Sequence, residues 1–318
     1  MNMNFAPIIL FVYNRPWHTQ QTIEALLRNH EVSKSELYIY ADGLKSTATE
    51  KQSIDLKKTR EYIHAISGFK SVTIIESNQN NGLGNSIING VTKTLEKYDS
   101  LIVLEDDMVV SPHFLRFMNE SLNRYNNDEE VICISGVNYP LESKVKENSF
   151  FIRGGDCWGW ATWKRAWKLF NPNAKVLLDY INKHKRIQKD FTFNGTMYYM
   201  DLLRAVVEGK NDSWAIRWYA STFISGGLCL YPTKSLVQNI GFGDEATNTK
   251  SSERDIVFTR IKASEEYVEY TKIPIKENKV ARKEFESIYE SLQYYPKTPF
   301  SKKIRKWFKR LIAYSKNA

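Results

Sequence analysis

The chain has 318 residues, and its hydrophobic fraction of 42% and aromatic fraction of 13% are those of a folded protein with a full core. No segment approaches the roughly 20 continuous apolar residues of a membrane-spanning helix. The formal net charge is +9, but seven cations lie in the last stretch with no acid among them, at Lys302, Lys303, Arg305, Lys306, Lys309, Arg310 and Lys316. The rest of the chain is therefore close to neutral, which argues against a nucleic-acid partner.

The cysteines indicate a reducing compartment. Cys133, Cys157 and Cys229 lie far apart in the sequence and form no C-x-x-C pair. Neither a disulfide framework nor a zinc site is predicted from this spacing. A cytoplasmic location fits best.

Predicted strands and helices alternate through the first part of the chain. A continuous apolar run at residues 6–13 (APIILFVY) predicts a strand that is covered on both faces. A helix follows, which Thr19 can cap and in which Ile23, Leu26 and Leu27 keep helical spacing. Further strands are expected at 36–43 (ELYIYADG), 71–77 (SVTIIES) and 101–107 (LIVLEDD), separated by helices near 50–67 and after 82–84. The predicted fold class is therefore α/β, with a doubly wound, mostly parallel sheet and helices on both faces.

The composition changes from about residue 135. The run GGDCWGWATWKRAW carries four of the eight tryptophans, at Trp158, Trp160, Trp163 and Trp167. A helical stretch is expected from Tyr180 to Val207, and a strand at 227–232 (GLCLYP). Residues after about 251 are charged and weakly patterned. This part of the chain is expected to build a pocket onto the first.

Polar residues follow three of the predicted strands, as Asn14-Arg15, Asp42-Gly43 and Glu105-Asp106-Asp107. In doubly wound sheets ligands bind outside the carboxyl ends of the strands, so these clusters are expected to converge. Three consecutive acids are costly to bury unless a cation or hydrogen-bond donors compensate them. Mg²⁺ or Mn²⁺ supplies that compensation and can bridge to a diphosphate. A solvated turn is the alternative interpretation.

The order of these features resembles the GT-A glycosyltransferases of the N-acetylglucosaminyltransferase I type, over roughly residues 6–120. The matching motifs are N-R-P, A-D-G, N-x-x-N-G-L-G-N and L-E-D-D-M-V-V-S-P-H-F. The V-x-P-x-F part of the last motif predicts a helix that starts at Pro112. Residues 155–163 and 213–218 also resemble bacterial family 2-like sugar transferases, which carry G-W-G-W-A-T-W and S-W-A-I-R-W.

The resemblance implies a nucleoside-diphosphate sugar as donor, with uridine as its base. Asp107 would be the direct ligand of Mn²⁺ or Mg²⁺, and Asp106 and Glu105 would contact ribose or the donor sugar. Asp42 would bind uracil or ribose, and Arg15 would lie against base or phosphate. These residue types suit the roles, because carboxylates accept from ribose hydroxyls and arginine suits stacking and diphosphate. A plain turn at Asp42 and a surface cation at Arg15 are the alternatives.

Other residues are candidates for donor and acceptor contacts. The glycines at 82–84 permit close backbone approach, and Asn85 or Ser86 can cap the next helix and present N–H groups to an anion. Trp158 and Trp160 stand beside glycines and can face the apolar side of a sugar, whereas Trp163 and Trp167 are expected in the core. In the loop at 239–249 this chain has A-T-N where relatives carry G-T-H.

An inverting transfer needs a general base that removes the proton of the acceptor hydroxyl. Asp212 is the candidate, because in the resembled family an acid just ahead of a tryptophan in the second half fills this role. Asp156 in the tryptophan-rich loop is an alternative. Asp201 is another, although its apolar helical neighbours favour a structural role.

The sequence thus predicts an inverting hexosyl- or N-acetylhexosaminyltransferase of bacterial surface polysaccharide or glycoconjugate synthesis. Residues 1–134 would form the nucleotide-sugar-binding half, 135–250 the acceptor-binding and catalytic half, and 251–318 a C-terminal extension. A sugar nucleotidyltransferase is the alternative, but it would carry a glycine-rich basic loop after the first strand. A non-catalytic nucleotide-sugar-binding module is a third possibility.

The tail predicts a basic amphipathic helix over residues 301–316. One face is apolar, with Ile304, Trp307, Phe308, Leu311 and Ile312 at helical spacing, and cations occupy much of the remainder. Such a helix either packs on the protein or lies on anionic lipid, and we favour the lipid. The protein would then be peripheral at the inner face of the cytoplasmic membrane, where a lipid-linked glycan acceptor is available.

Overall fold

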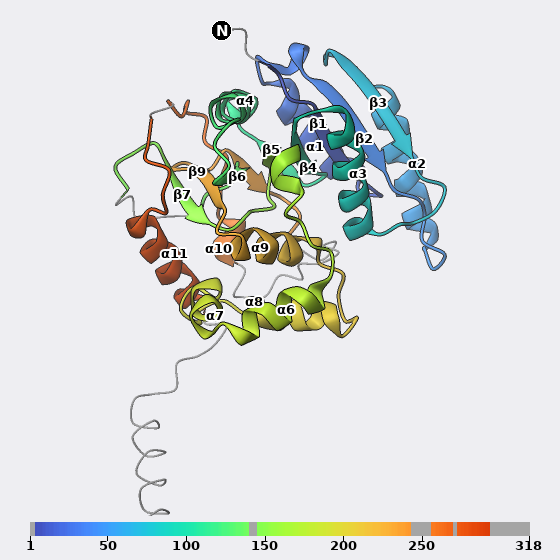
Figure 1. The fold of residues 1–318 in the computed structure, drawn as a ribbon. Coiled ribbons are helices and arrows are strands. Elements are labelled where there is room, and N and C mark those ends of the chain that lie inside the picture. The colour runs from blue at the N-terminus through green and yellow to red at the C-terminus, as the bar shows by residue number, and fades with distance from the viewer. Residues whose placement is uncertain (1–3, 140–144, 243–255, 270–271, 293–318) are drawn as a thin grey trace, which may run out of the picture.

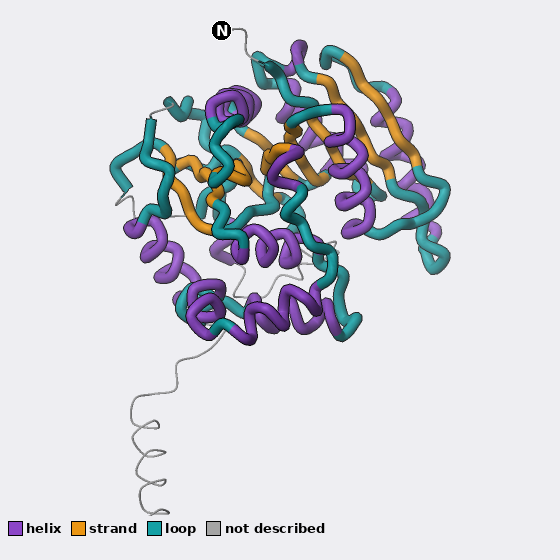
Figure 2. The backbone as a smooth tube through the Cα atoms, in the orientation of Figure 1, coloured by secondary structure: helices purple, strands orange, loops and turns teal. Residues whose placement is uncertain are grey.

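The computed structural model describes residues 4–139, 145–242, 256–269 and 272–292. An eight-stranded sheet forms its centre in the order β3-β2-β1-β4-β8-β6-β9-β7, and a separate ladder joins β10 to β5. Helices α6, α7 and α8 gather at the end of the molecule farthest from the N-terminus (Figures 1 and 2). The predicted α/β fold class is confirmed.

The first part of the chain forms the elements that the alternation predicted. The strands are β1 (Ile8–Val12), β2 (Glu36–Ala41), β3 (Ser71–Glu76) and β4 (Ser100–Glu105), and they pair in parallel. The helices are α1 (Pro16–Leu27), the short 3-10 helix Val32–Lys34, α2 (Glu50–His64) and α3 (Leu83–Lys97). Helices α1 and α2 contact each other. The connection from β3 returns across the sheet to β4, so a right-handed crossover puts α3 on the opposite face, where it contacts β1 and β4.

The remaining elements complete the sheet and surround it. The strands are β5 (Met108–Val110), β6 (Val131–Ser135), β7 (Ser149–Arg153), β8 (Trp160–Trp163), β9 (Leu228–Pro232) and β10 (Val237–Asn239). The helices are α4 (Phe114–Arg124), α5 (Lys164–Trp167), α6 (Ala174–Lys183), α7 (Lys185–Phe191), α8 (Tyr199–Val207), α9 (Trp214–Ile224), α10 (Ile256–Thr259) and α11 (Lys279–Ser291). A second apolar cluster, apart from the main core, joins α6, α7, α8 and α9.

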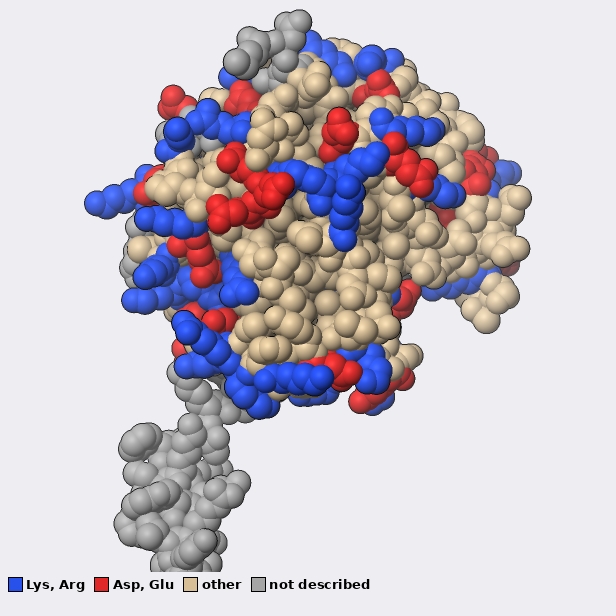
Figure 3. Space-filling model, in the orientation of Figure 1, with Lys and Arg blue, Asp and Glu red and all other residues tan. Residues whose placement is uncertain are grey.

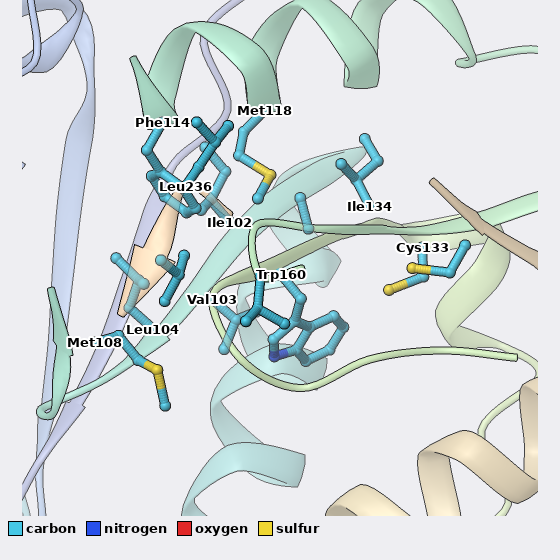
Figure 4. Packing of buried hydrophobic residues seen from close by; sticks show 14 of the residues in the cluster. Ile102, Val103, Leu104, Met108, Phe114, Met118, Cys133, Ile134, Trp160 and Leu236 are labelled. Carbon is cyan, nitrogen blue, oxygen red and sulfur yellow. The ribbon is translucent and has the colours of Figure 1, made fainter. Parts of the chain in front are cut away.

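Strand β8 joins the two parts of the chain into one sheet. It lies between β4 and β6 and is antiparallel to both. Its Trp160 packs beside Val103 of β4 in the buried core, as Figure 4 shows. The boundary expected at residue 134 falls inside β6, so the hydrogen-bonded sheet runs through it.

The helical stretch expected from Tyr180 to Val207 is divided among α6, α7 and α8. Between α7 and α8 the backbone φ angles are positive, at 48° for Phe193, 57° for Asn194 and 85° for Gly195. A right-handed helix cannot continue through residues in that region. The apolar periodicity carried no sign of this break.

Two helices begin at residues other than those predicted. Helix α1 starts at Pro16 rather than after Thr19, since a proline is tolerated in the first turn, where its missing N–H has no partner to lose. Helix α4 starts at Phe114 rather than at Pro112, because the chain first forms β5, which pairs with β10. This ladder was not predicted, since three-residue strands are too short to give a periodic signal.

Candidate active site at the carboxyl edge of the sheet

Glu105, Asp106 and Asp107, called here the acid turn, lie at the carboxyl end of β4 near the middle of the sheet, with Glu105 as the last residue of the strand. Arg15, which follows the neighbouring strand β1, donates from Nη1 to Asp107 Oδ2 at 2.8 Å and to Asp106 Oδ1 at 3.3 Å. The exposed fractions of these side chains are only 13% for Arg15, 11% for Asp106 and 14% for Asp107. Parallel pairing of β1 with β4 puts their carboxyl ends side by side, which brings these distant positions into contact.

Backbone contacts hold the acid turn from two sides. On one side, the Thr22 hydroxyl of α1 donates to the Asp106 carbonyl at 2.8 Å. On the other, the Ile240 N–H just after β10 donates to the Asp107 carbonyl at 2.9 Å. Gly241 lies so close that a Cβ there would overlap the Asp107 carboxylate. The acid turn is thus fixed between α1 and the β5–β10 ladder.

Burial and mutual repulsion change the protonation of the acids. Burial, followed by the charges of Asp107 and Asp106, raises the pKa of Glu105 well above its usual range, and Arg15 opposes the rise. Burial and Asp107 raise the pKa of Asp106 to about 7, against the opposing charge of Arg15. One guanidinium therefore does not neutralise three adjacent carboxylates, and the turn favours additional positive charge.

The chemistry of Asp107 fits a divalent cation. Within the described ranges, no three His, Cys, Asp or Glu side chains gather into a ready-made metal site. Asp107 Oδ1 is nevertheless buried without a hydrogen-bond partner, and a desolvated carboxylate oxygen needs a donor or a cation. Mg²⁺ and similar hard cations are commonly held by one or two carboxylates together with substrate phosphates and water. Asp107 can act in that way without further protein ligands.

Asp42, just after β2, holds the loop that leads into α3. Its Oδ1 accepts from the N–H groups of Gly43 and Asn81, both at 2.9 Å, and from Asn81 Nδ2 at 3.3 Å. Its Oδ2 accepts from Asn80 Nδ2 and the Gly82 N–H, both at 3.0 Å. An ionised carboxylate offers about four lone-pair sites, so these five donors fill it. A direct contact of Asp42 with uracil or ribose therefore requires one of them to be given up.

Asp212 lies at the start of α9 and is the most open of the predicted catalytic acids, with 59% of its side chain exposed. A Cβ on Gly84 would stand 2.8 Å from Asp212 Oδ2, so the carboxylate lies against the first turn of α3. Arg217, which is buried, donates from Nη2 to Asp212 Oδ1 at 3.0 Å. The sequence motif contained Arg217, but its role was missed because only the fold shows that it orients Asp212.

The two alternative acids are engaged elsewhere. Asp156 Oδ1 accepts from the N–H groups of Cys157 and Trp158 at 2.6 and 3.1 Å, and Oδ2 accepts from the Tyr231 hydroxyl at 2.9 Å. Burial raises the pKa of Asp156, and these hydrogen bonds oppose the rise. Asp201 is a surface residue of α8 that pairs with Arg204 at 2.5 Å. Structural contacts account for both acids, and the choice among the three candidate bases stays a prediction.

Residues 156–158 nevertheless lie near the acid turn. Burial raises the pKa of the Cys157 thiol well above its usual range, and the charges of Asp156, Glu105 and Asp107 contribute to the rise. Trp158 follows directly and is partly buried, with its ring 5.6 Å from Phe242 and 5.9 Å from Phe258. The contact of Trp158 with a sugar stays a prediction.

Trp160 does not face a sugar. It is fully buried and stacks on Trp214 at 5.4 Å, with Trp167 and Trp218 close by. Its expected role at the substrate is wrong, because four indoles pack together into the core. The expectation that Trp163 and Trp167 are core residues is confirmed by exposures of 1% and 8%.

Asn85 lies on the exposed side of the first turn of α3. Its Nδ2 donates to the Asn81 carbonyl at 3.0 Å, so in this structure it closes the turn that Asp42 organises. Of the loop at 239–249, only residues up to 242 lie within the described ranges. The predicted tail helix at 301–316 lies outside them.

The chain is similar to one known protein family and to several solved structures. Glycosyl transferase family 2 matches residues 8–182. A search of curated proteins found no match. Among solved structures, the chain is similar to a mannosyltransferase from Pyrobaculum calidifontis in complex with GDP-Man and Mn²⁺, with 14% identity, a TM-score of 0.31 and coverage of 44% of this chain and 37% of that one.

Two further solved structures are similar to the chain. TarS of S. aureus has 10% identity and a TM-score of 0.32, with 56% of this chain and 30% of that chain covered. A UDP-glucose pyrophosphorylase complexed with UDP-glucose has 12% identity and a TM-score of 0.32, with 71% and 90% covered. The chain spans only about a third of the length of the mannosyltransferase and of TarS.

The family match covers more than half of the chain and includes β1 to β4, the acid turn and β8. The resemblance to sugar transferases of family 2 is thereby confirmed, whereas the likeness to the N-acetylglucosaminyltransferase I type stays a prediction. The chain belongs to glycosyl transferase family 2, and its mixed α/β sheet is that of the GT-A fold.

Proposed function

We propose that this glycosyltransferase moves a hexosyl or N-acetylhexosaminyl group from a nucleoside-diphosphate sugar, with uridine as its base, to a glycan acceptor with inversion. The observation that carries the proposal is the buried acid turn, with Asp107 Oδ1 lacking a partner and Arg15 beside it. Mn²⁺ or Mg²⁺ bound at Asp107 would neutralise the charge of the departing diphosphate. The residues described above supply the remaining functions.

The donor lies over the carboxyl ends of β1, β2 and β4 in this proposal. Arg15 contacts the diphosphate, and Glu105 and Asp106 accept from ribose or donor-sugar hydroxyls. The loop that Asp42 holds presents its backbone and Asn85 to the nucleotide. Because Asp42 accepts from the Asn81 and Gly82 N–H groups of this loop, the nucleotide meets a preformed surface rather than a mobile one.

Asp212 acts as the general base. It removes the proton of the acceptor hydroxyl as that oxygen attacks the anomeric carbon from the side opposite the leaving diphosphate. Its exposure leaves room for an acceptor, and Arg217 keeps the carboxylate pointed in one direction. Trp158 offers an aromatic face for the acceptor or donor sugar.

The acceptor is a lipid-linked glycan at the inner face of the cytoplasmic membrane, in bacterial surface polysaccharide or glycoconjugate synthesis. No helix in the described residues is long and apolar enough to cross a bilayer. Exposed cations gather where α6 meets α7, at Lys183, Lys185, Arg186 and Lys189, and Figure 3 shows Lys and Arg along that lower face. Val176 and Tyr180 are exposed on α6, at 51% and 39%. Together with the basic tail sequence, this face suits an anionic bilayer surface.

A thermal-shift panel with UDP-, GDP- and dTDP-sugars, each with and without Mn²⁺, tests the donor. A bound ligand stabilises the folded state by RT ln(1 + [L]/Kd), so the true donor should raise the melting temperature only when Mn²⁺ is present. Asp107→Ala should remove the Mn²⁺-dependent part, and Asp201→Ala serves as a matched surface control. A Mn²⁺-dependent shift that survives in Asp107→Ala would overturn the metal assignment.

Product analysis tests the chemistry. NMR of the glycoside should show an inverted anomeric centre, and Asp212→Asn should bind donor normally while turnover falls by roughly 10² to 10⁴. Retained configuration or near wild-type turnover would remove Asp212 from the mechanism. Donor synthesis from a sugar phosphate and a nucleoside triphosphate would indicate a nucleotidyltransferase instead. Binding without turnover across many acceptors would indicate a non-catalytic module.

A further inference from the structure

Arg15 forms an incomplete ion pair with the acid turn. It reaches Asp106 and Asp107 through the single nitrogen Nη1, while its Nε is buried without a partner. The opposing Asp107 Oδ1 is also buried and unpaired. A guanidinium usually binds a carboxylate through two parallel hydrogen bonds, which would satisfy both groups. Here the Arg15 guanidinium and the Asp107 carboxylate each keep a hydrogen-bonding atom unused.

Arg217 shows what a structural arginine looks like in the same chain. Its Nε donates to the Ser213 carbonyl at 3.1 Å, Nη1 to the Pro172 carbonyl at 3.4 Å, and Nη2 to the Asp212 carbonyl and carboxylate at 3.3 and 3.0 Å. Each of its three nitrogens has an acceptor. The contrast indicates that the ion pair between Arg15 and the acid turn can be exchanged.

The backbone of Arg15 is fixed although its side chain is not fully satisfied. Arg15 is the residue that precedes α1, and its carbonyl accepts from the Thr19 N–H at 2.9 Å and the Thr19 hydroxyl at 3.0 Å. The guanidinium stands at the end of a flexible side chain on this fixed base. It can exchange partners without moving α1 or β1.

We propose that Arg15 is an exchangeable counter-cation, which occupies Asp106 and Asp107 in the free enzyme, yields Asp107 to a divalent cation, and then binds the diphosphate. This inference rests on the proposed nucleotide-sugar chemistry. The exchange keeps the acid turn compensated throughout, because a divalent cation replaces the charge that leaves. It also releases a planar donor group suited to a diphosphate.

The exchange couples metal binding to nucleotide binding. Without nucleotide, a metal at the unpaired Oδ1 of Asp107 faces the charge of Arg15 on Oδ2, and Arg15 gains no new acceptor by leaving, so the affinity for the metal is lowered. With nucleotide, the displaced guanidinium gains new acceptors, so each ligand favours the other by the same factor. Free Mn²⁺ should therefore bind weakly alone and tightly together with UDP.

Two direct binding measurements test this, neither of which needs turnover. Electron paramagnetic resonance of free Mn²⁺ gives metal affinity without nucleotide, and calorimetry with UDP at saturating Mn²⁺ gives nucleotide affinity. Arg15→Met should bind Mn²⁺ alone at least about tenfold more tightly, because a competing charge is removed. It should bind UDP about tenfold more weakly, because a charge-assisted hydrogen bond is lost. Arg15→Gln repeats the test should the methionine variant fold poorly.

The matched control is Arg165→Met. Arg165 is a partly buried arginine of α5 that donates to the Tyr125 and Asn126 carbonyls, so its removal should leave both affinities unchanged. Arg15→Lys should recover Mn²⁺ affinity close to wild type, because the competing charge returns.

The two affinities must move in opposite directions. The exchange would be overturned if the Arg15 variants lost affinity for both Mn²⁺ and UDP, or if their affinity for Mn²⁺ did not change. Either result would show that Arg15 has only a structural role. If the wild-type enzyme binds no Mn²⁺ even with UDP, the proposed metal chemistry fails as well. If the wild type shows Mn²⁺–UDP coupling and Arg15→Met retains it in full, only the exchange fails.

Discussion

Asp42 is predicted to stabilise the fold and the donor loop together. Asp42 is 9% exposed, and its carboxylate receives five donors, three of which are the backbone N–H groups of Gly43, Asn81 and Gly82. In Asp42→Ala the Asn81 and Gly82 N–H groups lose their acceptor, whereas the Gly43 N–H keeps a hydrogen bond to the Gln79 carbonyl at 3.2 Å. At roughly 1 kcal/mol for each lost hydrogen bond once water partly replaces the carboxylate, the free energy of unfolding should fall by about 2 kcal/mol.

Asp42→Asn provides a graded comparison. The remaining carbonyl oxygen can still accept from Gly43 and Asn81, but the new NH₂ group faces the Gly82 N–H and Asn80 Nδ2, which are themselves donors. A loss of about 1 kcal/mol is expected, between wild type and alanine. Both variants should also bind UDP more weakly, because the loop that leads into α3 loses its anchor.

Urea unfolding at pH 7 measures these losses, with an unchanged m-value as evidence that only stability has changed. The control is Asp201→Ala, which removes an exposed partner of a surface ion pair and should cost less than about 1 kcal/mol. If Asp42→Ala loses UDP binding while its stability stays within about 0.5 kcal/mol of wild type, the carboxylate contacts the nucleotide rather than the loop, and the reasoning is refuted.

Four further predictions follow from the packing. Gly84→Ala should lower turnover more than stability, because the new Cβ would stand 2.7 Å from the Asp212 carbonyl oxygen and 2.8 Å from Asp212 Oδ2. Steady-state kinetics together with urea unfolding measures both effects, and an unchanged turnover would contradict the prediction. Trp160→Ala should destabilise the protein by about 3 to 5 kcal/mol in urea unfolding, since it empties a buried indole site, and a loss under about 1 kcal/mol would contradict its core role. The raised pKa of Asp156 means that the folded state holds the proton of this group more tightly than the unfolded chain does. The contribution of Asp156 to stability is therefore present below about pH 4 and is lost as the pH rises through the folded pKa. Asp156→Asn should remove that part of the pH dependence of the melting temperature. Deleting residues 301–318 should leave UDP binding unchanged and abolish salt-sensitive association with anionic vesicles, whereas an unfolded product would mean that the tail is a packing element.

The sequence by itself determined most of the first half of the fold. Continuous apolar runs such as residues 8–12 mark strands buried on both faces, and the observed β1 is buried along its whole length. Polar residues directly after such runs, including Asp42 and the acid turn, then have to lie at one edge of a parallel sheet. These inferences succeed because burial and strand direction are recorded locally, within a few residues of each position.

Only the tertiary structure decided what those residues touch. Arg15 contacts Asp107 because β1 and β4 are neighbours in the sheet. Trp160 is buried because it packs against indoles of α9, which lie more than 50 positions away in the sequence. Strand β8 has four residues and joins the sheet between β4 and β6, which no local periodicity of that length can indicate. The sequence records which side chains are apolar or charged, whereas their partners depend on strand order, and strand order is set by the packing of the whole chain.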